Sequence, residues 1–106
     1  MLSFFFCIVL YLYWVINMIR KRIVFKGRVQ GVGFRFTAFR YASHVGLSGW
    51  VKNMYDGSVL MEVQGHLSLI NQLMNYLNND HYIRIDEMNE RNIDIKESES
   101  GFGVKY

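Results

Sequence analysis

The spacing of hydrophobic residues changes several times between residue 22 and the end of the chain. Where they recur at every second residue, the pattern predicts half-buried strands, and where they recur at every third or fourth residue it predicts amphipathic helices. On this basis we predict strands over 22–29, 48–55, 58–64 and 82–88, shorter strands over 92–96 and 102–106, and helices over 34–46 and 67–77.

The order of these elements indicates a fold class. A strand and a helix are followed by two strands that meet at Asp56-Gly57, a dipeptide typical of tight hairpin turns, and then by a second helix and further strands. This order is the duplicated split β-α-β motif, βαββαβ. We therefore expect an α+β domain of the ferredoxin-like type, an α/β sandwich with two helices on one face of an antiparallel four- to five-stranded sheet.

Residues 1–19 form an apolar leader in which only Ser3 and Asn17 are polar. As a helix, this run would extend about 27 Å, close to the roughly 30 Å hydrocarbon core of a bilayer. One interpretation is a membrane anchor, in which case the basic residues that follow favour the cytoplasmic side for the rest of the chain. The other is a translation start assigned too far upstream, because Met18 would make a natural start. In both cases we assign residues 20–106 as the folded domain and expect it in the cytoplasm.

Charge is distributed unevenly along the chain. The 106 residues fit one domain, and the single cysteine, Cys7, excludes an intramolecular disulfide. The formal net charge of the whole chain is +3, but the basic and acidic residues lie in different parts of it. Residues 23–54 contain five basic residues and no acidic residue, whereas all 9 acidic residues follow this stretch. An electropositive first half suits an anionic ligand.

A glycine-rich segment, GRVQGVGFR at residues 27–35, joins the first predicted strand to the first predicted helix. Its glycines allow positive φ angles, and successive N–H groups in such a turn form an anion-binding nest. The start of the helix adds free N–H groups, and Arg35 in its first turn offers a guanidinium that matches two phosphoryl oxygens. Phe36 stands where a dinucleotide-binding motif would need glycine, and the Gly-Lys-Ser/Thr of a nucleotide P-loop is missing here.

The same segment resembles the signature of the acylphosphatase family, Gly-x-Val-Gln-Gly-Val-x-Phe-Arg. A second motif of that family follows at the expected distance, with GWVKN at residues 49–53 and then Gly57, Val59 and Gly65. The two separated motifs lie in the strand and loop context that the family requires, and the ending FGVKY also matches. The resemblance covers residues 22–106.

This resemblance implies an enzyme that hydrolyses acyl phosphates to a carboxylate and inorganic phosphate. Arg35 would bind the phosphoryl oxygens together with the backbone N–H groups of the loop, which are those of Gln30, Gly31, Val32, Gly33 and Phe34. Asn53 would orient the attacking water through its side-chain amide. A carboxylate leaves without a protonating acid, and positive groups neutralise the phosphate, so we expect no metal and no cofactor.

The expected partner is a small-molecule acyl phosphate. His44, His66 and His81 lack the spacing of a metal site, and we expect a monomer that contacts a membrane only if the leader is an anchor. An alternative function is a non-catalytic module on the same fold that binds an anion or nucleic acid. Because no RNA-binding strand with stacking aromatics is present, we expect no nucleic-acid partner. A third interpretation is one domain of a larger carbamoyl-transfer protein of hydrogenase maturation, for which the chain is short.

Overall fold

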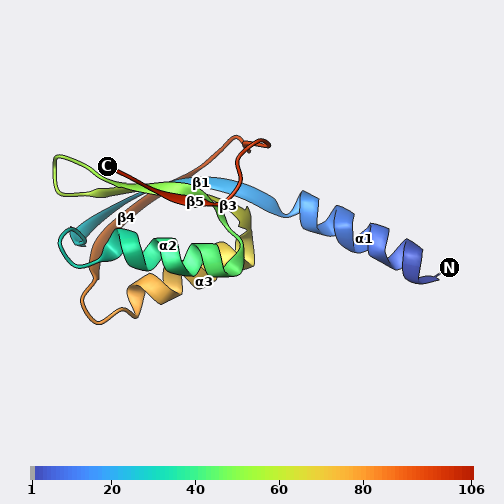
Figure 1. Ribbon diagram of the computed structural model, residues 1–106, viewed down its shortest axis with the longest axis horizontal. Coiled ribbons are helices and arrows are strands. Elements are labelled where there is room, and N and C mark those ends of the chain that lie inside the picture. Colours follow the sequence, from blue (N-terminus) through green and yellow to red (C-terminus); the bar gives the residue numbers. More distant parts are fainter. Residues whose placement is uncertain (1) are drawn as a thin grey trace.

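The computed structural model describes residues 2–106, without the side chains of residues 2 and 14–16. Figure 1 shows a single helix that projects away from two layers, a sheet and a pair of helices. The projecting helix is α1 (Leu2–Ile16), and its described side chains are exposed. Among the described residues, no helix combines the length and the apolar character needed to cross a membrane.

The domain itself consists of two helices and five strands. In chain order they are β1 (Met18–Arg28), α2 (Phe34–Val45), β2 (Ser48–Asn53), β3 (Val59–His66), α3 (Leu67–Asn78), β4 (Arg84–Ile93) and β5 (Phe102–Lys105). Both helices begin at the residues that the hydrophobic spacing predicts. The left-handed Gly46, with φ of 82°, ends α2, and the ring of His66 accepts a hydrogen bond from the N–H of Ser68 at the start of α3. The predicted ferredoxin-like α+β fold is confirmed.

The sheet has the strand order β4-β1-β3-β2-β5. β1 pairs antiparallel with β3 and β4, and β2 pairs antiparallel with β3 in the predicted hairpin. β5 instead pairs parallel with β2, with Gly49 opposite Phe102 and Val51 opposite Val104, so the five-stranded sheet is mixed. This direction follows from the topology, because β4 runs opposite to β1 and β2, and one reversal of the chain after β4 restores their direction.

Helices α2 and α3 cover one face of the sheet (Figure 1). The core between the helices and the sheet contains alternate residues of the strands, and helix residues at three- and four-residue spacing. Its buried members include Ile23, Phe25, Val51, Met61 and Val63 from the strands and Ala38, Ala42, Ile70, Leu73 and Leu77 from the helices. Each large side chain buried here contributes about 1.5–3 kcal/mol relative to exposure. This packing holds the first turn of α2 close to the end of β1, where the glycine-rich loop lies.

The opposite face of the sheet carries a buried cluster of charges. The guanidinium of Arg20 is fully buried and donates to Glu62 at 2.9 Å, to Glu99 at 2.6 Å and to Gln64 at 3.2 Å. Arg22 also donates to Glu62, at 2.6 Å. Because Glu99 belongs to the segment between β4 and β5, these bonds fasten that segment over the helix-free face.

Two strands, β1 and β4, are longer than the sequence predicts. β1 begins at Met18 rather than at residue 22, because partners far along the chain neutralise Arg20 inside the sheet. β4 extends from Arg84 to Ile93 and includes parts of both predicted segments, since it pairs with β1 over nearly all of its length. Local spacing does not show either pairing, which depends on residues distant in sequence.

Candidate active site

The loop between β1 and α2 turns through two left-handed glycines, Gly31 with φ of 73° and Gly33 with φ of 79°. Other residue types rarely adopt this conformation. Gly33 is also the N-cap of α2 and has no side chain to bond to the first turn. The first N–H of α2 that donates to a backbone carbonyl is that of Thr37, to Gly33 at 2.9 Å. Within the described residues, no backbone carbonyl accepts from the N–H groups of residues 30–36, which are therefore available to an anion at the positive end of the helix.

Arg35 lies in the first turn of α2 and makes no ion pair with an acidic group in the part of the chain that the structure describes. Its Nη1 donates to the backbone carbonyl of Lys105 at 3.3 Å. Its guanidinium carbon lies 5.0 Å from the centre of the Tyr106 ring. A carbonyl and an aromatic ring orient the side chain without neutralising it, so its charge remains available to an anionic ligand.

Asn53 is the last residue of β2, where it pairs with Val59 of β3. Its amide oxygen Oδ1 is buried and has no hydrogen-bond partner among the residues that the structure describes. Leaving a buried polar atom unpaired costs about 1–3 kcal/mol, and such an atom calls for a functional or solvent-related explanation. The orphaned oxygen is therefore suited to accept a hydrogen bond from a water molecule or a ligand.

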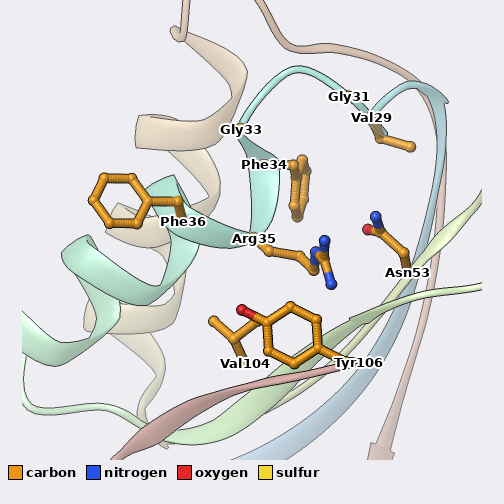
Figure 2. Close-up of a pocket in the computed structure, with 9 residues that line it drawn as sticks. All are labelled: Val29, Gly31, Gly33, Phe34, Arg35, Phe36, Asn53, Val104 and Tyr106. Carbon is orange, nitrogen blue, oxygen red and sulfur yellow. The ribbon is translucent and has the colours of Figure 1, made fainter.

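A cavity of about 230 Å³ brings the loop, Arg35 and Asn53 together. Figure 2 shows the guanidinium of Arg35 and the amide of Asn53 pointing toward each other beside the glycine loop. The lining consists of Val29, Gly31, Gly33, Phe34, Arg35, Phe36, Asn53, Val104 and Tyr106. The two predicted site residues come from a helix and a strand, and the fold places them at one cavity.

The side chains of the loop and of the first residue of α2 are uncharged and contact other parts of the domain. The ring of Phe34 is buried and packs on Phe25, with 4.9 Å between ring centroids. Val32 packs against the core, and the amide of Gln30 bonds to the turn between β2 and β3. Because none of these side chains carries a charge, the loop presents its main-chain N–H groups as the polar surface for an anion.

Sequence reasoning missed Val104 and Tyr106, which line the cavity from the end of the chain. Their position depends on the parallel pairing of β5 with β2, and no local pattern indicates that pairing. Trp50 does not line the cavity, and the ammonium of Lys105 lies 4.1 Å from the centre of its ring. Among the described residues, no group of three or more His, Cys, Asp or Glu is arranged to hold a metal ion.

The comparison with known proteins identifies the family. The acylphosphatase family model matches residues 21–104, almost the whole domain. The chain belongs to the acylphosphatase family. The acylphosphatase of Clostridium perfringens strain 13 is 41% identical over 88 residues, which cover 82% of this chain and 99% of that protein. The acylphosphatase of Geobacillus thermodenitrificans is 36% identical over 88 residues, with 82% and 94% covered.

Solved structures of other proteins have the same fold. The crystal structure of the acylphosphatase from Bacillus subtilis superposes with a TM-score of 0.76 at 29% identity, covering 84% of this chain and 99% of that chain. The HypF structure from T. kodakarensis superposes with a TM-score of 0.71 at 30% identity, and covers 81% of this chain but only 12% of that longer chain. The acylphosphatase fold thus occurs among these relatives both as most of a chain and as a small part of one.

Proposed function

We propose that this member of the acylphosphatase family hydrolyses acyl phosphates to a carboxylate and inorganic phosphate in the cavity beside the 29–33 loop. In this proposal, Arg35 and the loop N–H groups bind the phosphoryl group, and Asn53 holds the attacking water. The observation that carries it is that three groups meet at one cavity. Within the described residues, the guanidinium has no acidic partner, the N–H groups have no backbone acceptor, and the amide oxygen has no hydrogen-bond partner. Family membership supports the reaction itself.

The first role of the site is to neutralise charge. The equatorial oxygens of a phosphoryl group in transfer carry the negative charge, and catalysis consists mainly of positioning and electrostatic stabilisation. The guanidinium of Arg35 can bind two of these oxygens, while the loop N–H groups bind the others. Because no backbone carbonyl among the described residues accepts from these N–H groups, they can bind the phosphoryl group without first breaking such a bond.

The second role is to place the water. The Oδ1 of Asn53 accepts a hydrogen bond from one O–H of the water and directs a lone pair of the water oxygen at phosphorus. As the new P–O bond forms, the bond from phosphorus to the acyl oxygen breaks, and its electron pair leaves with the carboxylate. Both water protons end on the phosphate, so an acyl phosphate dianion and water give a carboxylate and dihydrogen phosphate. The conjugate acid of a carboxylate has a pKa of about 4, so no general acid is needed.

Hydrolysis of acetyl phosphate by the full chain tests both roles. We expect Arg35→Ala to lower kcat/KM by about 10²–10³-fold, the usual effect of removing one donor to developing charge. Asn53→Ala is expected to lower kcat by about 10²-fold because the water loses its position. Arg91→Ala and Asn71→Ala, at exposed positions of β4 and α3, serve as matched controls and retain wild-type turnover. Near wild-type activity in either site variant would contradict the assigned roles.

The proposal includes no metal. The same assay in excess EDTA is therefore expected to give an unchanged rate, and a rate that falls with EDTA and returns on adding a divalent cation would contradict it. Binding of inorganic phosphate by a wild-type protein that does not hydrolyse acetyl phosphate would indicate the alternative, a non-catalytic anion-binding module.

Two further predictions accompany this function. We infer that the protein is a monomer, because the cavity is complete within one chain. We also infer a cytoplasmic location for the domain. Light scattering of the purified chain at micromolar concentration tests the first, and fractionation of cells that express it tests the second.

A further inference from the structure

The side chain of Gln30 is the part of the loop that makes bonds outside it. Its Nε2 donates to two main-chain carbonyls, that of Met54 at 2.7 Å and that of Ser58 at 2.8 Å. The amide group has two N–H donors, so both are used. Gln30 is half-buried, and both bonds are partly shielded from water.

The two carbonyls belong to the neck of the turn between β2 and β3. The N–H of Met54 donates to the carbonyl of Ser58 at 2.9 Å, and the N–H of Gly57 donates to the carbonyl of Met54 at 3.2 Å. Met54 directly follows Asn53 in the chain. The bonds of Gln30 therefore connect the anion-binding loop with the backbone that immediately follows Asn53.

We propose that Gln30 is a positioning residue, which sets the distance between the loop N–H groups and the amide of Asn53. The proposal rests on the proposed function and deepens it, because the phosphoryl group is bound by the loop while the water is held by another element. Sheet hydrogen bonds join β1 to β3 and β3 to β2, but within the described residues the loop itself has no backbone hydrogen bond to the β2–β3 turn. The side chain of Gln30 supplies that connection.

This role predicts that loss of the Gln30 bonds affects kcat but not the affinity for phosphate. The N–H groups of the loop bind phosphate without help from Asn53, so losing the connection leaves the affinity for inorganic phosphate nearly unchanged. Attack by water needs both parts in register, and a misplacement of about 1 Å is enough to lower a rate by about 10²-fold. The kcat therefore responds to Gln30 more strongly than phosphate binding does.

The test uses the full chain with Gln30→Met, which keeps the shape of the side chain and removes both donors. We expect kcat for acetyl phosphate to fall by about 10-fold or more, while the inhibition constant of inorganic phosphate changes by less than about threefold. Gln72→Met, at an exposed position of α3, is the matched control and keeps the wild-type kcat. The decisive step repeats Gln30→Met in an Asn53→Ala background, where we expect less than about a twofold further loss because the two residues act through one geometry.

A second variant covers the case in which Gln30→Met folds poorly. Gln30→Glu directs a carboxylate at two carbonyl oxygens, and this arrangement raises the pKa of the new acid. As the pH is lowered, the protonated acid regains one donor, and we expect the kcat of this variant to recover toward wild type while that of Gln30→Met does not.

The proposal is wrong if Gln30→Met keeps the wild-type kcat, if it costs the same factor with and without Asn53, or if kcat and phosphate affinity fall together. These outcomes differ from failure of the proposed function, which would show as absent turnover in the wild type or as full turnover in Asn53→Ala. In the latter cases the variants of Gln30 have no geometry to disturb, and the positioning role falls with the function.

Discussion

Arg20 lies near the start of β1, and Arg35 lies in the first turn of α2, beyond the other end of that strand. The two arginine side chains have contrasting surroundings. Arg20 is fully buried, and carboxylates of Glu62 and Glu99 neutralise it. Arg35 is only half-buried and contacts a carbonyl and a ring. A charge whose partners are inside the protein contributes to structure, whereas a charge left without a counter-ion is available to a ligand. The contrast predicts, without reference to any relative, that Arg20 serves the structure and that Arg35 binds a ligand.

Replacing each arginine by methionine is the strongest test of this contrast. Arg20→Met leaves Glu62 and Glu99 without their main partner, and we expect the free energy of unfolding to fall by about 3 kcal/mol, at the low end for a broken buried pair because Arg22 still bonds to Glu62. Arg35→Met is expected to change it by less than about 1 kcal/mol, since no charge among the described residues loses its partner. Urea unfolding measures both. A larger loss of stability in Arg35→Met would reverse the two assignments.

Binding of inorganic phosphate gives a second test of the contrast between Arg20 and Arg35. A ligand at 100 times its Kd stabilises the folded protein by about 2.7 kcal/mol. We expect this gain in the wild type and in Arg20→Met, and a much smaller gain at the same phosphate concentration in Arg35→Met. Urea unfolding with and without phosphate is the measurement, with sulfate-free chloride buffer at equal ionic strength as the control. Equal gains in all three proteins would mean that phosphate binds away from Arg35.

Lowering the pH is expected to weaken the charge cluster around Arg20 gradually. Burial acts to raise the pKa of Glu62, but hydrogen bonding and charge attraction from the Arg20 guanidinium outweigh burial and hold this pKa below its ordinary value of 4.5. A carboxyl with a lowered folded-state pKa contributes stability that is complete above 4.5 and is lost as the pH falls through the folded-state value. Urea unfolding between about pH 7 and pH 3 should show this loss in the wild type. In Glu62→Gln the same pH range should have a shallower effect, and equal slopes would contradict the assignment.

A third arginine gives the smallest effect. Arg84 pairs with Asp86 at 3.0 Å, but both side chains are more than half exposed. Exposed pairs contribute about 0–1 kcal/mol, so we expect Arg84→Ala to change the free energy of unfolding by less than about 0.5 kcal/mol and to leave acetyl phosphate hydrolysis unchanged. A loss as large as that of Arg20→Met would show that burial is not what separates these arginines.

The elements predicted correctly are those whose signals are local. α3 follows from the spacing of Leu67, Ile70, Leu73 and Leu77, and the β2–β3 hairpin follows from Asp56-Gly57. A turn or an amphipathic face depends only on neighbours within a few residues. The positions of the two helices in the sequence, and with them the general fold, were therefore predictable.

The parts that sequence did not reveal depend on distant residues. Arg20 belongs to a basic run beside the apolar leader, and its burial becomes favourable only because Glu62 and Glu99 meet it, 42 and 79 positions away. The parallel direction of β5, and so the place of Tyr106 beside Arg35, also depends on pairing across the sheet.

The candidate site also has parts that the sequence predicts and parts that only the structure shows. Glycine spacing predicts a loop that can receive an anion, and a motif resemblance adds Asn53, but the orphaned state of its amide oxygen is visible only in the structure. The bonds from Gln30 to the hairpin are equally hidden, because they span 24 and 28 positions.

These bonds end on main-chain carbonyls, which every amino acid possesses. Substitutions at Met54 and in the rest of the turn, including the fully exposed Tyr55, can therefore accumulate without removing the acceptors that Gln30 uses. Under the role proposed for Gln30, such a protein can diversify the β2–β3 turn during evolution while the spacing between the loop N–H groups and Asn53 is inherited unchanged.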